Sequence, residues 1–234
     1  MSSDAAFDAL NAEALTELFD AHALELAPRL LGSRLSVTTD EGTVTVRITE
    51  VEAYGDQGED PGAHGYNGQT PRNASLFGPP RHAYVYRSYG IHFCLNLVSH
   101  AAGAGGVLLR AGETLEGREL AVARRGGKDT GVKLLSGPGR LGQGLGVDLS
   151  MDGSPVEILD EIPAPLPVPS AGARFTLAPS EQPLQAEEIS AGPRVGVSGE
   201  GGTASYPWRF WVAAERSVSP YRPSAPRRRP VKDR

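Results

Sequence analysis

The strongest constraint on the fold is an alternation of apolar and polar residues on both sides of a short polar turn. Apolar residues occupy every second position in 35–37 and again in 44–48, with the turn-forming residues 40–42 between them. Period-two alternation is typical of strands with one buried face and predicts an antiparallel hairpin. Continued along the second strand, the pattern places Glu50 and Glu52 on the apolar side, unless a bulge interrupts it. An inward carboxylate is costly unless it is hydrogen-bonded or used, so both are candidate site residues.

The remaining sequence predicts short elements separated by frequent turns. The chain has 29 glycines and 19 prolines in 234 residues, well above the roughly 12% average for these two residue types. Further strands are predicted at 83–97, where two aromatic-rich strands turn at Tyr89 and Gly90, and at 106–110, 156–159, 194–197 and 208–212. Helices are predicted over 11–31, where Pro28 opens a second helix that Gly32 ends, over 115–125, and from an N-cap and opening at 136–138. This mixture indicates a single domain of α+β type.

A long loop is predicted between residues 55 and 80, where glycine, proline, asparagine and aspartate are frequent. Long loops inside compact domains are often functional. We divide the chain into an N-terminal acidic helical segment over 1–30, packed on the domain, the domain itself over 31–213, and a basic tail over 214–234. The proline and arginine residues of 223–230 are typical of a disordered tail.

Charge is arranged along the chain in blocks of one sign. The formal net charge of -5 argues against a strongly basic nucleic-acid binder. Residues 64–145, however, hold ten basic and four acidic residues, and 205–234 hold eight basic and two acidic ones. This asymmetry favours a polyanionic partner, although a solvated charged surface would have the same composition.

Several protein classes are excluded by what the sequence lacks. The single cysteine, Cys94, can form neither an intramolecular disulfide nor a cysteine-rich zinc site. No apolar run approaches the roughly 18 residues of a membrane span, and the acidic first 30 residues do not resemble a secretory signal. The histidines lack the spacing of a zinc motif, and no nucleotide-phosphate loop is evident. We therefore expect an intracellular protein without a metal or cofactor.

Aromatic residues are concentrated where the loop and the second hairpin meet in sequence. Tyr89 falls at a hairpin turn, which suits either an exposed turn residue or a wedge that fills the space left by an extruded base. Enough aromatic faces to enclose a planar ligand are available from Tyr54, His64, Tyr84 and Tyr86. Packing in the core is the alternative role for these side chains.

Several motifs in a fixed order closely resemble the alkyladenine (3-methyladenine) DNA glycosylase family. The matching residues are Glu50–Tyr54, Ala63 and His64, Gln69–Asn73, Tyr84–Tyr86, Tyr89 and Gly90, Phe93–Asn96, Val107–Arg110 and Ser136–Pro138. The resemblance extends from about residue 30 to 156, with a weaker match at 194–197 and 208–212. It implies a curved antiparallel β-sheet with peripheral helices and a protruding β-hairpin.

The resemblance also implies roles for the residues of a catalytic pocket. Glu52 matches the general base that activates water, and Arg110 resembles the residue that helps to hold this water and the adjacent phosphate. Tyr54 on one side, with His64 and Tyr86 on the other, resemble the stack around a flipped base. Asn96 resembles the residue that crowds the 2-amino group of guanine and so protects the normal base.

DNA contacts are implied for a further set of residues. Tyr89 resembles the intercalating wedge, with Ile91 and His92 beside it, where better-known members carry a larger thioether and an aromatic residue. The interval between Glu52 and His64 is one residue longer than in those members. The expected backbone contacts are Arg72, Arg81, Arg87, Lys133 and Arg140.

The implied function is the repair of double-stranded DNA that contains alkylated or deaminated purines. The resemblance implies a monomeric, monofunctional enzyme that starts base excision repair, with no lyase step because no lysine occupies a matched catalytic position. The expected location is a bacterial cytoplasm, in association with the nucleoid. Two alternatives are a lesion-binding protein without activity and a metal-dependent hydrolase that uses Glu52 and His64.

Overall fold

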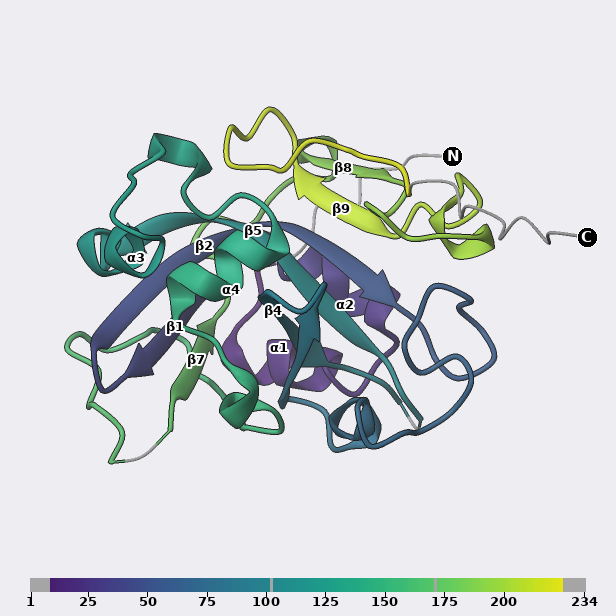
Figure 1. The fold of residues 1–234 in the computed structure, drawn as a ribbon, viewed down its shortest axis with the longest axis horizontal. Coiled ribbons are helices and arrows are strands. Elements are labelled where there is room, and N and C mark those ends of the chain that lie inside the picture. The colour runs from purple at the N-terminus through teal and green to yellow at the C-terminus, as the bar shows by residue number, and fades with distance from the viewer. Residues whose placement is uncertain (1–8, 102, 171, 225–234) are drawn as a thin grey trace, which may run out of the picture.

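One curved sheet organises the molecule (Figure 1). The computed structural model describes residues 9–101, 103–170 and 172–224. Within them the strands are β1 (Arg34–Thr39), β2 (Gly42–Tyr54), β3 (Ala83–Ser88), β4 (His92–Val98), β5 (Gly106–Glu116), β6 (Val156–Ile158), β7 (Arg174–Ala178), β8 (Ile189–Gly192) and β9 (Arg209–Val212). The strand order is β3-β4-β5-β2-β1-β7-β6, while β9 pairs with β2 and β8 pairs with β9. The predicted α+β domain with a curved sheet is confirmed.

The sheet is antiparallel except at one edge. β6 and β7 pair in parallel, which makes the sheet mixed at this edge. A parallel pair needs a long connection between its strands, and the proline-rich segment 163–169 lies within that connection. The predicted hairpin around 40–42 is confirmed, because β1 and β2 pair from Arg34 with Arg47 to Thr39 with Gly42.

Four α-helices are present among the described residues: α1 (Ala12–Leu18), α2 (Ala23–Arg29), α3 (Arg118–Arg124) and α4 (Pro138–Leu145). Short 3-10 turns occur at 74–77, 131–133, 149–151, 186–188 and 200–202. The Asn11 side chain caps α1 by accepting the N–H of Ala14 at 2.8 Å. In Figure 1, α2 lies behind the sheet and α4 lies in front of it, so helices cover both faces.

Three predicted boundaries are wrong for local reasons. Pro28 does not open the second helix but lies inside α2, which begins after the cap His22. The predicted helix over 115–125 starts late, because β5 continues to Glu116 and Gly117, at φ 69°, separates strand from helix. α4 starts at Pro138 with Gly137 at the cap position and no side-chain cap, so Ser136 does not fill that role.

The C-terminal part of the described chain also differs from expectation. Residues 194–197 form a turn rather than a strand, and β9 pairs with β2 and β8. Residues 215–222, here called the C-terminal strap, lie against β2, where the hydroxyls of Ser217 and Thr49 are 2.8 Å apart. These contacts with β2 lie beyond residue 213. The division into three regions stays a prediction, and the arginine run 227–229 lies outside the described residues.

The core lies along β2, which is buried on both faces from Val44 to Ala53 except at Arg47. Val46 and Ile48 belong to one apolar cluster together with Leu26 of α2 and Leu141 of α4. Two helical layers thus enclose this strand, and any carboxylate on it is removed from bulk water. Within the described residues, no helix is both long and apolar enough to span a bilayer.

Candidate active site

A bulge in β2 brings two carboxylates into the interior. The pairing of β2 with β5 shifts between Ile48 and Glu50 and again between Glu50 and Val51. The bulge that the alternation left open is therefore present. Glu50 and Glu52 are both 0% exposed. A buried carboxylate requires compensating donors.

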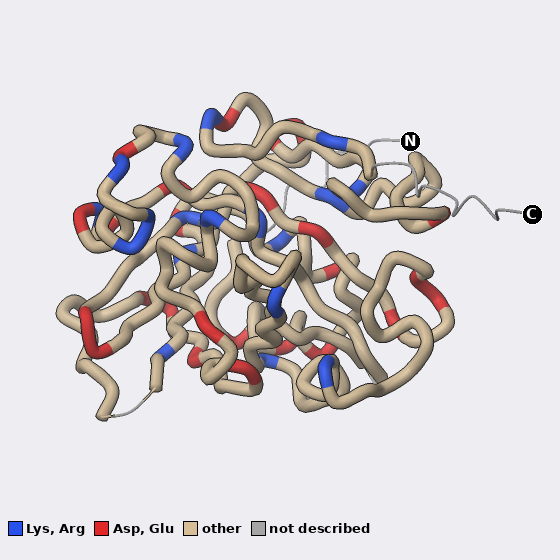
Figure 2. Tube along the Cα trace, in the orientation of Figure 1, with Lys and Arg blue, Asp and Glu red and all other residues tan. Residues whose placement is uncertain are grey.

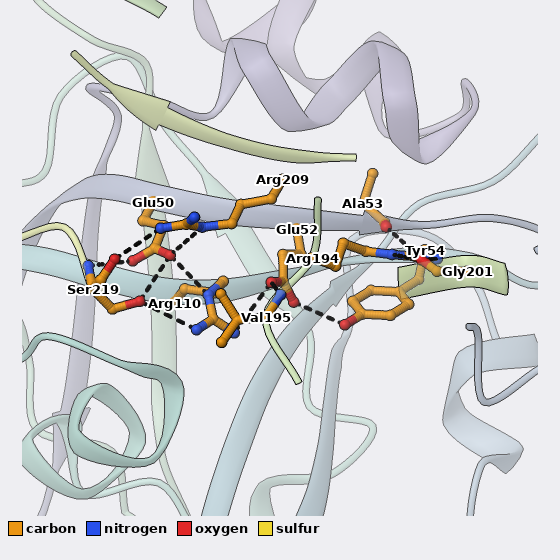
Figure 3. Close-up of polar contacts among 10 residues, drawn as sticks. All are labelled: Glu50, Glu52, Ala53, Tyr54, Arg110, Arg194, Val195, Gly201, Arg209 and Ser219. Atoms are coloured by element: carbon orange, nitrogen blue, oxygen red, sulfur yellow. Dashed lines mark hydrogen bonds and ion pairs between the residues drawn. The ribbon is translucent and has the colours of Figure 1, made fainter. Parts of the chain in front are cut away.

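Glu50 is the centre of a buried ionic network (Figure 3). Its carboxylate accepts the Nε–H of Arg110 at 2.9 Å and the Nε–H of Arg209 at 2.7 Å. It also accepts the main-chain N–H of Ser219 at 2.7 Å and the Ser219 hydroxyl at 2.9 Å. Burial alone would raise the pKa of Glu50, but the charges of Arg110 and Arg209 and the Ser219 hydrogen bond hold it below its ordinary value of 4.5.

Glu52 is held by a different set of donors. Its Oε2 accepts the hydroxyl of Tyr54 at 2.8 Å, and its Oε1 accepts the main-chain N–H of Val195 at 2.6 Å. The Nη1 of Arg110 lies 3.3 Å from Oε1. Arg110 thus contacts both carboxylates, and although burial opposes its charge, Glu52 and Glu50 raise its pKa above the ordinary value. Glu50 therefore positions Arg110 beside Glu52.

A cavity of about 560 Å³ opens at Glu52. Its lining includes eight of the residues proposed from the sequence: Glu52, Tyr54, His64, Arg72, Tyr86, Tyr89, Asn96 and Arg110. The other residues proposed for DNA contacts lie outside the lining: Arg81, Arg87, Ile91, His92, Lys133 and Arg140. The cavity is thus lined by residues from loop 55–80, the second hairpin and strands β2 and β5. Residues of the turn 195–198 complete its lining.

One side of the cavity is a tightly packed aromatic wall. The rings of His64 and Tyr86 lie 4.6 Å apart at an interplanar angle of 76°. The Nδ1 of His64 is 2.9 Å from the hydroxyl of Tyr84, which fixes the orientation of the imidazole. Burial, with a smaller contribution from the charge of Arg72, lowers the pKa of His64 below 6.5. The imidazole is therefore neutral at neutral pH and can donate or accept one hydrogen bond toward a ligand.

Tyr54 lines the cavity and is fixed at its hydroxyl by Glu52. Asn96 also lines it, and its Nδ2 donates to the carbonyl of Tyr84 at 3.0 Å. This bond sets the orientation of the Asn96 amide. A ligand between Tyr54 and the His64–Tyr86 wall would therefore meet fixed side chains, which favours shape discrimination.

The second hairpin carries an exposed aromatic residue at its tip. Tyr89 is 89% exposed with φ 49°, and Gly90 follows with φ 72°. Ile91, also at the tip, is 72% exposed. The helix α4 packs closely against the start of β4, because a Cβ on Gly142 would come within 2.1 Å of the carbonyl oxygen of Phe93. This close approach supports the end of the hairpin that carries the turn.

The basic side chains proposed for phosphate contacts are not equivalent. Arg72 lies over the Tyr86 ring at 6.0 Å and donates to the carbonyl of Arg87 at 3.3 Å. Lys133 donates to the carbonyl of Val218 at 2.8 Å, and Arg140 is exposed. Arg81, in contrast, pairs with Asp20 at 2.7 Å and donates to the carbonyl of Thr16. Its interactions tie the hairpin to the α1 region, so the structure does not support a phosphate contact there. In Figure 2, basic positions occur around α3 and the loop after it, with acidic positions interspersed.

Three site residues were missed from the sequence: Val195, Arg209 and Ser219. Val195 acts through its main-chain N–H, which any residue other than proline could supply, and Ser219 uses its main-chain N–H together with its hydroxyl. Val195 and Arg209 lie in the two weakly matched segments, 194–197 and 208–212, which gave the available hint. Among the described residues, no group of three or more His, Cys, Asp or Glu side chains is arranged to hold a metal ion.

Comparison with known proteins identifies one family. A family model described as methylpurine-DNA glycosylase matches residues 17–216. A protein of Streptomyces avermitilis is 46% identical over 214 residues, covering 91% of this chain and 93% of the relative. A protein of Leifsonia xyli is 46% identical over 212 residues, covering 88% and 91%, and one of Frankia casuarinae is 44% identical over 213 residues, covering 91% and 93%. Each relative is named as a proposed 3-methyladenine DNA glycosylase.

Proposed function

The chain belongs to the methylpurine-DNA glycosylase family, and from that premise we propose that its cavity receives a damaged purine flipped out of duplex DNA. Membership makes it a DNA N-glycosylase of DNA repair. The proposed substrates are 3-methyladenine, 7-methylguanine, ethenoadenine and hypoxanthine in double-stranded DNA. Because these bases are stacked in the duplex, the enzyme must extrude them before it can reach the glycosidic bond.

The position of Glu52 carries the proposal. Its carboxylate is buried, faces the cavity and is oriented by Tyr54, Val195 and Arg110. Hydrolysis passes through an oxocarbenium-like sugar, so a carboxylate at this point both opposes the positive charge and accepts a proton from water. The water oxygen bonds to carbon 1′ while the glycosidic electron pair leaves with the purine. Arg110 holds Glu52 and contacts the water or the adjacent phosphate.

The aromatic walls support selection by charge and shape. Tyr54 on one side and His64 with Tyr86 on the other present π faces to the base. Such faces attract a cationic ring, and alkylation at N3 or N7 makes the purine a cation. Asn96 crowds the position of a 2-amino group, which disfavours normal guanine.

The exposed hairpin supports the role of a wedge. Tyr89 projects next to the cavity and would fill the space that the extruded base leaves in the duplex, with Ile91 contacting the neighbouring stack. Arg72, Arg87, Lys133 and Arg140 supply phosphate contacts, which position the DNA without reading its sequence. We further propose a monomeric, monofunctional enzyme that needs no cofactor and acts in a bacterial cytoplasm in association with the nucleoid.

The decisive experiment measures base release from duplexes that contain 7-methylguanine, 1,N6-ethenoadenine or hypoxanthine, in the presence of EDTA. The wild-type chain should leave an abasic site without strand cleavage, and Glu52→Gln should release base at least roughly 100-fold more slowly. Glu59→Gln, which changes a partly exposed carboxylate of the next loop, is the matched control. Equal release by Glu52→Gln and wild type would disprove the mechanism. Tight lesion binding with no abasic product on any substrate would identify a lesion-binding protein instead.

A further inference from the structure

The side of Tyr54 away from the cavity is covered by a buried cation. The Cζ of Arg194 lies 4.5 Å from the centroid of the Tyr54 ring, and Arg194 is 0% exposed. Tyr54 lines the cavity and Arg194 does not. The guanidinium also lies 5.2 Å from the Trp208 ring and 5.8 Å from the Tyr206 ring. A base in the cavity would therefore be separated from a fixed positive charge by one aromatic ring.

The charge of Arg194 is balanced by one carboxylate. Its Nη1 and Nη2 donate to the two oxygens of Asp60 at 2.5 Å and 2.6 Å, and Asp60 is also 0% exposed. Asp60 additionally accepts the main-chain N–H groups of Gly55 and Gly62 at 3.1 Å and 2.8 Å. A Cβ on Gly62 would meet Nη2 of Arg194 at 2.5 Å, so a glycine is needed for this close approach.

Electrostatics gives this pair a consequence for the ligand. An aromatic ring attracts a cation through the negative charge of its faces, and a second cation on the opposite face repels the first. An unbalanced Arg194 would therefore weaken the binding of a cationic base against Tyr54 and leave a neutral base largely unaffected. With Asp60 bound bidentately, the pair has no net charge. The other charges near this ring, Glu52 at its hydroxyl and Arg110 beyond it, belong to the catalytic network.

We propose that Asp60 and Arg194 together set the preference of the cavity between cationic and neutral damaged bases, acting through Tyr54. They are specificity-determining residues that do not touch the base. The inference rests on the proposed function, because it assumes that the base stacks on Tyr54. The inference gives the buried ion pair of Asp60 and Arg194 behind the Tyr54 ring a role in that function.

The test compares two substrates in the same duplex sequence, 7-methylguanine as the cationic base and 1,N6-ethenoadenine as the neutral one. The quantity is the ratio of their kcat/KM values, because a misfolded fraction lowers both values equally and leaves the ratio unchanged. In Asp60→Asn the ratio of cationic to neutral should fall by roughly tenfold, since Arg194 is left unbalanced. In Arg194→Gln the ratio should rise, since Asp60 is then the unbalanced charge.

Three further variants separate charge from structure. The double variant Asp60→Asn with Arg194→Gln should return the ratio to within about threefold of wild type. Arg194→Lys keeps the charge and should keep the ratio even if both rates fall. Glu59→Gln removes a carboxylate from the same loop, one that pairs with His22 at the surface, and should change nothing.

The outcomes distinguish this inference from the proposed function. Normal activity on both bases with a ratio that is equal in wild type, Asp60→Asn and Arg194→Gln would overturn the inference and leave the function intact. If only one of Asp60→Asn and Arg194→Gln folds, the direction in which its ratio changes decides between keeping and rejecting the inference. If neither folds, an altered ratio in the double variant overturns the inference. Absence of release from either base by the wild-type chain would overturn the proposed function itself.

Discussion

The Oε1 of Glu52 accepts the main-chain N–H of Val195 at 2.6 Å, although the two residues are 143 positions apart. The bond joins the bulged strand β2 to the turn that closes the cavity. Main-chain donors keep their position better than long side chains do, so this N–H orients the carboxylate that faces the cavity. The same oxygen lies 3.3 Å from Arg110, so one atom receives two of the donors on Glu52.

Replacing the donor should lower catalysis without weakening binding. Val195→Pro removes the N–H, and we expect kcat on a 7-methylguanine duplex to fall by roughly 10- to 100-fold with little change in KM, because the carboxylate loses part of its orientation. Val195→Ala keeps the N–H and should remain near wild-type kcat. Single-turnover kinetics measures the catalytic rate of both variants, and thermal unfolding shows whether each is folded. Equal losses of rate in Val195→Pro and Val195→Ala would contradict the role of the N–H.

Tyr89, the proposed wedge, should affect binding of duplex DNA and not the hydrolysis of the glycosidic bond. Tyr89 is 89% exposed, so Tyr89→Ala should leave the melting temperature unchanged within about 2 °C. Affinity for a lesion duplex should fall by roughly tenfold, since stacking of an aromatic side chain against bases is lost. Release of base from single-stranded substrate should change little, because no duplex stack needs to be opened. The exposed Val168 provides a control, and Val168→Ala should alter neither quantity.

The activity should decline in acid because His64, which lines the cavity, becomes protonated. Burial and the charge of Arg72 lower the pKa of His64 below its ordinary value of 6.5, so the imidazole is neutral at neutral pH and becomes cationic in acid. A cationic His64 repels a cationic base, and kcat/KM on 7-methylguanine should fall as the pH decreases through this pKa. In Arg72→Gln the pKa of His64 rises toward 6.5, which should move the acid limb to higher pH. Arg87→Gln also removes an arginine, one that lies on β3 and does not contribute to the lowered pKa of His64, and should leave the limb where it is.

Glu50 should stabilise the fold in a pH-dependent way. Glu50→Gln leaves Arg110 and Arg209 buried with a neutral partner, and the free energy of unfolding at pH 7 should fall by about 3–5 kcal/mol. The folded-state pKa of Glu50 is depressed, so its contribution is present above its ordinary value of 4.5 and is lost as the pH falls through the lower folded-state value. Urea unfolding between pH 3 and 7 should therefore show a shallower acid loss in the variant.

A surface carboxylate provides the comparison for this experiment. Glu113 is about half exposed and pairs with Arg47 at 2.8 Å. Glu113→Gln should cost less than about 1 kcal/mol, because exposed ion pairs contribute little. Similar losses in Glu50→Gln and Glu113→Gln would show that the buried network does not contribute more than an ordinary surface pair.

Local sequence patterns predicted those elements whose structure depends on residues close to one another in the chain. The alternation around 40–42 predicted the β1–β2 hairpin, because period and turn chemistry act over a few residues. It placed Glu50 and Glu52 inward only in the absence of a bulge, and the bulge is present. Pro28 and Ser136 show the limit of that approach. Their types suggest helix starts, but α2 begins after the cap His22 and α4 begins at Pro138 with Gly137 at the cap position. A residue type that is common at helix starts therefore does not by itself fix the boundary.

The partners of the two carboxylates could not be predicted in the same way. Ser219 and Val195 reach Glu50 and Glu52 from 169 and 143 residues away through backbone groups. Asp60 and Arg194 are charged residues in glycine-rich segments, where exposure is the ordinary expectation, and only the fold shows that they face each other. The roles assigned through the family resemblance to Tyr54, His64, Asn96 and Tyr89 stay predictions, although most of the proposed residues line one cavity.

The C-terminal strap completes the polar scaffold around Glu52 late in synthesis. Ser219 binds Glu50, and the carbonyl of Arg222 accepts the N–H of Gly196, the neighbour of Val195. Both contacts support groups that hold Glu52, and the ribosome adds these residues after every other part of that scaffold. A nascent chain that still lacks them contains the two buried carboxylates without part of the framework that orients them. The network around Glu52 is therefore one of the last parts of the domain that synthesis can complete.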